Sequence, residues 1–258
     1  MTENLRKIYW LLSAQFGLDV RRTLLSLRGI PRYLADWLRF RKKYEGQLNF
    51  FPCLHDWYAE GGTTKSEYFV QDLHVARKIH LKNPSRHVDI GSRIDGFVAH
   101  VASFREIEVF DIRPVTSLIP GVIFRQEDLM NPNISLAGHC DSLSCLHALE
   151  HFGLGRYGDP IDPNGYVTGF GNMAGLLKAR GIFYLSVPIG RERVEFNAHR
   201  IFNPLLLVRL AALKGLMLQD FAWVEPGRTL MDSISPEKDM LTLSKLRYAL
   251  GIFTFVKQ

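Results

Sequence analysis

The sequence predicts an α/β protein whose core is a mainly parallel β-sheet. From residue 67 onward, short apolar runs of strand length alternate with longer segments of helical periodicity. Glycine or proline separates most of these segments, and several apolar runs end in an acidic residue. This alternation of strands and helices is typical of a parallel sheet covered by helices. With 258 residues, of which 47% are apolar, the chain is long enough to bury such a core.

Residues 1–66 are predicted to form a basic helical extension that ends in a loop. Between residues 4 and 43, apolar side chains recur at helical spacing in two or three short helices, the last beginning at Pro31. Leucine and aromatic side chains on one side, with arginine and lysine on the other, suit either a lid over a pocket or a helix at an anionic membrane surface. The first apolar run is short and interrupted by polar residues, which favours an amphipathic helix over a signal peptide.

The domain predicted for residues 67–258 holds seven strands and four helices. Ser66 is expected to cap the first helix and Asn203 to cap the last, and residues 131–133 are expected to form a turn. The expected strands are 88–90, 107–111, 122–124, 140–149, 182–187, 216–224 and 249–256. The expected helices are 67–81, 97–102, 173–180 and 205–213.

The stretch HVDIGSRIDGFVAHVASFREIEVFDIRP has the order of a nucleoside-binding half-sheet. A strand leads into a turn bounded by Gly91 and Gly96, a helix follows, and the next strand ends at Asp111. Glycines let the backbone approach a ligand, and the Asp111 carboxylate can accept hydrogen bonds from two ribose hydroxyls. The ligand is therefore expected to be a nicotinamide dinucleotide or S-adenosylmethionine.

Two residues in this turn favour S-adenosylmethionine. Arg93 stands where the dinucleotide pattern G-x-G-x-x-G has its middle glycine, and its side chain would crowd a pyrophosphate. Asp89 would repel the pyrophosphate, whereas an acid is favourable near a cationic sulfonium. NAD is kept as the alternative cofactor.

The same residues resemble class I S-adenosylmethionine-dependent methyltransferases. Asp89-Ile90-Gly91 matches part of their first motif, Asp111 matches the acid that ends their second strand 22 residues later, and Asp128 matches the acid after their third strand. The resemblance implies a Rossmann-like fold with a mainly parallel seven-stranded sheet and helices on both faces. It places Asp89 and Gly91 near the methionine part, Asp111 on the ribose and Asp128 near the adenine. The predicted cofactor-binding residues are Asp89, Gly91, Ser92, Arg93, Gly96, Asp111 and Asp128.

Two further stretches are similar to a small methyltransferase-like family. They are CLHALEHFGLGRYGDPIDPNG, beginning at Cys145, and SVPIGRERVEFNAHRIF, beginning at Ser186. Bacterial members of that family often sit among genes for surface polysaccharides. The resemblance implies that the methyl acceptor is a hydroxyl of a sugar or glycan precursor.

Methyl transfer to a hydroxyl usually needs a general base, and the chain offers several after its fourth and fifth strands. Histidine titrates near neutral pH and is the first choice. Three arginines near the fifth strand are expected to bind an anionic group of the acceptor by forked hydrogen bonds. The candidate catalytic residues are His147, His151, His199 and Asp159, and the candidate substrate-binding residues are Arg191, Arg193 and Arg200.

The sequence also bears on three other classes of function. His147-Ala148-Leu149-Glu150-His151 matches the zinc-peptidase pattern H-x-x-E-H, but that pattern needs a stable helix and glycines follow at once, so no metal is expected. The net charge of +6 permits nucleic-acid binding, yet the Asn/Asp-Pro-Pro-aromatic motif of amino-methylating nucleic-acid enzymes is absent, and no nucleic acid is expected. A non-catalytic scaffold with a degenerate cofactor site is another alternative. Three cysteines without a disulfide framework indicate a cytoplasmic protein, which the basic N-terminal helices could hold at the inner face of the membrane.

Overall fold

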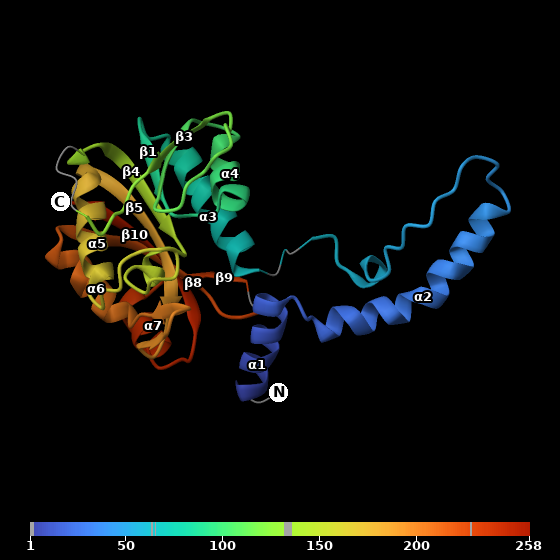
Figure 1. The fold of residues 1–258 in the computed structure, drawn as a ribbon. Coiled ribbons are helices and arrows are strands. Elements are labelled where there is room, and N and C mark those ends of the chain that lie inside the picture. Colours follow the sequence, from blue (N-terminus) through green and yellow to red (C-terminus); the bar gives the residue numbers. More distant parts are fainter. Residues whose placement is uncertain (1–2, 63, 65, 132–135, 228) are drawn as a thin grey trace. The chain divides into compact units, whose positions relative to one another are not determined.

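The structure is a computed structural model that describes all residues except 1–2, 63, 65, 132–135 and 228 (Figure 1). The chain divides into two compact units, Met1–Thr63 and Thr64–Gln258. Most of the turn predicted at residues 131–133 lies outside the described residues. No helix among the described residues is long and apolar enough to cross a membrane.

The larger unit is built on an eight-stranded sheet in the order β3-β2-β1-β4-β5-β10-β8-β9. β1 to β5 are parallel to one another, whereas β10 pairs antiparallel with both β5 and β8, and β9 pairs antiparallel with β8. The strands are β1 (His87–Ile90), β2 (Ile107–Asp111), β3 (Val122–Gln126), β4 (Cys140–Leu146), β5 (Leu177–Ile189), β8 (Leu216–Val224), β9 (Leu230–Asp232) and β10 (Ala249–Lys257). A separate hairpin joins β6 (Arg193–Glu195) to β7 (His199–Ile201).

Helices cover both faces of this sheet (Figure 1). One buried cluster joins the strands to α3 (Glu67–Lys82) and to the irregular helix formed by η3 (Ile94–Val98) and α4 (Ala99–Ala102). The other cluster joins them to α5 (Gly165–Leu176), α6 (Pro204–Leu213) and α7 (Pro236–Leu243). Along β5 the side chains alternate between the two clusters, as the period of two of a β-strand requires.

The structure confirms the α/β class and corrects the strand count. The sheet has eight strands rather than seven, because the three-residue β9 adds to one edge and is too short to show a periodicity. The helix predicted at 173–180 begins earlier, at Gly165, and β5 already starts at Leu177. The strand predicted at 140–149 ends at Leu146, because His147 takes a left-handed conformation with φ +54°.

The smaller unit is mainly helical up to Arg41. It contains α1 (Glu3–Trp10), a π-helical turn η1 (Leu11–Gln15), α2 (Val20–Arg41) and a short 3₁₀ turn η2 (Asp56–Tyr58). Asp19 caps α2 by accepting a hydrogen bond from the Arg22 N–H at 3.0 Å. Pro31 does not start a helix but lies inside α2, so the second and third predicted helices are one.

Candidate functional site

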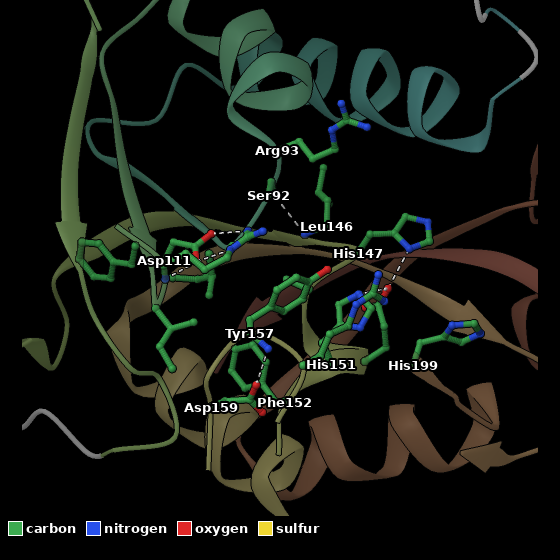
Figure 2. A pocket seen from close by; sticks show the side chains of 18 of the residues that line it. Ser92, Arg93, Asp111, Leu146, His147, His151, Phe152, Tyr157, Asp159 and His199 are labelled. Atoms are coloured by element: carbon green, nitrogen blue, oxygen red, sulfur yellow. Dashed lines mark hydrogen bonds and ion pairs between the residues drawn. The ribbon is translucent and has the colours of Figure 1, made fainter. Parts of the chain in front are cut away.

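A pocket of about 290 Å³ lies at the carboxyl ends of the parallel strands in the larger unit. The ends of β1, β2 and β4 supply much of its wall, and the first turns of α3 supply Glu67, Tyr68, Gln71 and Asp72. Figure 2 shows Asp111 at one end and His147, His151 and His199 at the other. Ligands of open α/β sheets bind at this edge.

The turn after β1 depends on a glycine and on a carboxylate beneath it. Gly91 has φ +68°, and a Cβ there would lie 2.9 Å from the Ala148 Cβ, so the position excludes a side chain. Asp89 is fully buried and does not line the pocket. Its carboxylate accepts hydrogen bonds from the Ser92 N–H (3.0 Å), the Ser92 hydroxyl (2.7 Å) and the Ser144 hydroxyl (2.5 Å). Burial raises its pKa to about 7. Asp89 therefore stabilises the conformation of the turn through buried hydrogen bonds.

Arg93 and Gly96 are placed differently from the other turn residues. The Arg93 guanidinium is exposed and forms two hydrogen bonds to Asp95, at 2.8 and 3.1 Å, while the residue itself still lines the pocket. Gly96 does not line the pocket; a Cβ there would lie 2.9 Å from a carboxylate oxygen of Asp72. The side chain of Arg93 thus lies in solvent, which leaves its backbone to face the pocket.

Asp111 and Asp128 both line the pocket, and both already accept hydrogen bonds. Arg113 binds the Asp111 carboxylate through Nε (3.0 Å) and Nη2 (2.6 Å), and its guanidinium lies 4.5 Å from the centre of the Tyr157 ring. Asp128 accepts from the Met130 N–H at 2.9 Å and from the Asn131 side chain at 2.8 Å. Asp111 also accepts the Arg113 N–H at 2.8 Å. An ionised carboxylate offers about four acceptor positions, so Asp111 retains about one for a ligand and Asp128 about two.

At the other end of the pocket, His147 and Glu150 form a buried ion pair. The His147 Nδ1 lies 2.8 Å from Glu150 Oε1, and the imidazole stacks on Tyr68 with ring centres 4.4 Å apart. Burial opposes both charges, but the attraction within the pair outweighs it: the pKa of His147 is raised and that of Glu150 is lowered. His147 Nε2 and Glu150 Oε2 are buried without a hydrogen-bond partner, which makes them available to a ligand.

His151 and His199 differ from His147 in the direction in which their pKa values are shifted. His151 Nδ1 lies 2.7 Å from the carbonyl oxygen of Ala198 and must donate to it, so the neutral ring has its lone pair on Nε2. Burial lowers the pKa of His151 and also that of His199. Asp159 instead shapes its own loop, because its carboxylate accepts the N–H groups of Gly155 (3.0 Å) and Tyr157 (3.1 Å).

The three arginines expected to bind the acceptor do not line the pocket. Arg191 is exposed, Arg193 binds Glu195 (2.9 Å) and the carbonyl of Arg247 (2.8 Å), and Arg200 donates to the carbonyls of Phe152 and Pro163. Arg113 and Arg156 line the pocket in their place. In the β6–β7 hairpin, the guanidinium groups of Arg193 and Arg200 are directed to backbone carbonyls.

The pattern H-x-x-E-H does not form a zinc site here. Only Leu149–His151 is helical, and it is a single 3₁₀ turn, so the two histidines do not lie one α-helical turn apart. Glu150 lies between them, 2.8 Å from one ring and 3.7 Å from the other. Within the described part of the chain, no three His, Cys, Asp or Glu side chains form a group that could hold a metal.

Several pocket residues were not among the predicted site residues. Tyr248 donates a hydrogen bond from its hydroxyl to Glu67 Oε1 at 2.6 Å, and Glu67 Oε1 lies 3.7 Å from His147 Nε2. These contacts join residues from opposite ends of the larger unit, so no local spacing could reveal them. The capping residue Ser66 does predict where α3 begins, and hence that Glu67 and Tyr68 lie in its first turn.

Comparison with known proteins identifies the fold. Residues 123–243, just under half of the chain, match a family described as Caenorhabditis protein of unknown function, DUF268. No curated protein matches the sequence. The structure is similar to 1,6-didemethyltoxoflavin-N1-methyltransferase of Burkholderia thailandensis, solved with 1,6-didemethyltoxoflavin and S-adenosylhomocysteine, at 15% identity and a TM-score of 0.51, covering 88% of this chain and 90% of that one. It is also similar to the N-methyltransferase NodS of Bradyrhizobium japonicum, solved with S-adenosylhomocysteine, at 12% identity and a TM-score of 0.50, covering 78% and 91%. The chain therefore has a Rossmann-like methyltransferase fold.

Proposed function

We propose that the protein is an S-adenosylmethionine-dependent methyltransferase that methylates a hydroxyl of a sugar or related glycan precursor in the cytoplasm. The observation that carries this proposal is the placement of Asp111 in one pocket with the glycine turn at Gly91, on a methyltransferase fold. Both similar structures named above contain S-adenosylhomocysteine. The acceptor class rests on the sequence resemblance to the polysaccharide-associated family.

The residues of the pocket fit this cofactor. Gly91 presents bare backbone to the pocket, which a ligand can approach closely, and the Asp111 carboxylate is positioned to accept a hydrogen bond from a ribose hydroxyl. Asp128 would lie near the adenine, and the backbone of Ser92 and Arg93 near the methionine part. Seven acidic residues and three arginines line the pocket, and this excess of acids favours a cationic sulfonium over a pyrophosphate. When bound, the cofactor supplies an electrophilic methyl group.

We assign the general base to His151. Its Nδ1–H donates a hydrogen bond to the Ala198 carbonyl, so the lone pair of the neutral ring is on Nε2. Its pKa is lowered, which keeps the ring neutral at pH 7. Nε2 can therefore accept the proton of the acceptor hydroxyl. Glu150 Oε1, 3.7 Å from that nitrogen, would stabilise the imidazolium that forms. His147 is less suited because its ion pair with Glu150 raises its pKa and so favours the protonated ring, which has no lone pair to accept a proton. Its unpartnered Nε2–H and the free Oε2 of Glu150 are placed to bind hydroxyl groups of the acceptor.

Calorimetry on the full chain tests the cofactor. We expect S-adenosylhomocysteine to bind with a micromolar Kd and NAD to show no binding at millimolar concentration, because the acidic lining repels a pyrophosphate. NAD binding in place of S-adenosylhomocysteine would support a dinucleotide-dependent enzyme. Binding of neither compound below millimolar would end the enzyme proposal and favour a scaffold.

Replacement of His151 by alanine is expected to reduce kcat by about 10²–10⁴-fold, since a positioned base contributes a factor of that size. The acceptor would first be found by measuring S-adenosylhomocysteine release over a panel of nucleotide sugars and glycosides. In the wild type, kcat/KM should rise with pH and then level off. The midpoint of the rise should lie below the ordinary pKa of histidine, because burial lowers the pKa of His151. The Kd of the His151→Ala variant for S-adenosylhomocysteine should stay within about twofold of the wild-type value. His199→Ala is the matched comparison, and a loss of turnover that follows His199 instead would refute the assignment.

A further inference from the structure

One face of α2 carries an exposed apolar stripe. Val20, Leu24, Leu27, Leu34 and Leu38 follow one another at steps of four, three, seven and four residues, and this spacing places them on the same side of a helix. Each of these side chains is between 43% and 61% exposed. Pro31 occupies the position that would complete the stripe. Large apolar side chains in such a continuous row mark a surface that binds something.

The opposite face of α2 is already covered by its own unit. After the helix, the chain turns back along it (Figure 1), and Gly29 packs so closely on Leu54 that a Cβ would lie 2.1 Å from the Leu54 carbonyl oxygen. Phe50 packs edge-on against Tyr33 and Trp37, with ring centres 5.1 and 6.3 Å apart. The returning segment thus completes one face of a small core and leaves the stripe uncovered within its unit.

Arginines flank the stripe. Arg21, Arg28, Arg32 and Arg39 also recur at steps of seven and four residues, which places them in a row beside the leucines. Arg28 and Arg32 lie over the rings of Tyr58 and Trp57, which orients their guanidinium groups. In all, α2 contains six arginines and one acidic residue. An apolar stripe beside a row of cations complements a surface that has an apolar interior and an anionic outer layer.

We infer that α2 docks on a bilayer containing anionic phospholipids, with the leucine stripe in the acyl boundary and the arginines on the lipid phosphates. A second copy of the chain is a poorer partner, because pairing two stripes would bring arginine rows of like charge together and Pro31 would interrupt the seam. The helix lies on the surface, since no helix among the described residues can span a membrane. This inference does not depend on the proposed enzymatic activity.

Sedimentation of the full chain with sucrose-loaded vesicles tests the inference. Vesicles of 30% phosphatidylglycerol in phosphatidylcholine are expected to bind the protein at least about tenfold more tightly than pure phosphatidylcholine. Leu24→Glu/Leu34→Glu and Arg21→Glu/Arg28→Glu should each reduce binding by about tenfold or more, with unchanged circular dichroism. Leu213→Glu, which places a glutamate at an even more exposed leucine at the end of α6, is the control and should bind like the wild type.

Three results would overturn the inference. Equal binding to both vesicle types would remove the role of the arginines. If the Leu24→Glu/Leu34→Glu variant bound vesicles as tightly as the wild type, the apolar stripe would have no role in membrane binding. A dimer in light scattering that this variant dissociates would instead assign the stripe to a second copy.

Discussion

Replacement of Asp111 by alanine is expected to weaken S-adenosylhomocysteine binding about 100-fold. The carboxylate ends β2 inside the pocket. Beside its three hydrogen bonds from Arg113 it has about one further acceptor position, which a ribose hydroxyl can occupy. Hydrogen bonds to a charged group contribute about 1.5–3 kcal/mol each, and about 1.4 kcal/mol corresponds to a tenfold change in Kd. Calorimetry with wild type and variant measures the ratio directly.

The chain provides a matched control for this experiment. Asp95 accepts two hydrogen bonds from the Arg93 guanidinium, as Asp111 does from the Arg113 guanidinium, and in both pairs the residues are two apart. Asp111 accepts a third from the Arg113 N–H. The Asp95 carboxylate is exposed and does not line the pocket. Asp95→Ala should therefore leave the Kd within about threefold, as expected for an exposed pair. Similar losses in the two variants would show that Asp111 has no special role in binding.

The end of the pocket that contains Gly91 and Asp111 was largely predictable because its signals are local. A strand, a glycine turn and an acid at the next strand end lie within 25 residues, and sheet topology then brings Gly91 and Asp111 to one edge. The acid of the first motif shows the limit of such reasoning. Asp89 carries the pattern, yet burial and three hydrogen bonds place it under the turn rather than in the pocket.

The end of the pocket that contains the histidines was less predictable because it depends on contacts between distant residues. The histidine-rich segment after β4 was found, but its pairing was not: Glu150 lies closer to His147 than to His151. The arginines of the β6–β7 hairpin read as free cations in the sequence, whereas Arg193 and Arg200 bind carbonyl groups in the structure. A hairpin of two three-residue strands has too few residues to show a period of two.

The displaced helix has a physical reason of the same kind. α5 contains four glycines among its 12 residues, and glycine has the lowest helix propensity after proline. The glycines are there because the neighbours of the helix leave no room for a side chain: a Cβ at Gly169 would lie 2.4 Å from the Phe152 ring. Close packing against these neighbours stabilises the helix in spite of its glycines. Tertiary packing here overrides a local preference, and only the apolar end of the helix, from Met173, was recognisable.

Replacement of Glu150 by alanine is expected to lower the free energy of unfolding by about 3–5 kcal/mol near pH 6, the usual cost of removing one partner from a buried ion pair. The effect should depend on pH. The raised pKa of His147 gives stability that is fully present below its unfolded value of about 6.5 and is lost as pH rises through the folded value. The lowered pKa of Glu150 gives stability that is present above about 4.3 and is lost at lower pH.

The difference between wild type and Glu150→Ala should therefore be largest between about pH 4.5 and 6.5 and smaller at pH 9, where His147 can be neutral in both proteins. Urea unfolding at pH 5.5 and pH 9 measures it. His147→Gln/Glu150→Gln is the control: it removes both charges while keeping side chains of similar size, so it should cost less than the single change at pH 5.5. A single-variant cost that is equal at both pH values would show that the pair is not charged in the folded protein. His147 would then be a second neutral imidazole beside His151, and the choice of base between them would be open again.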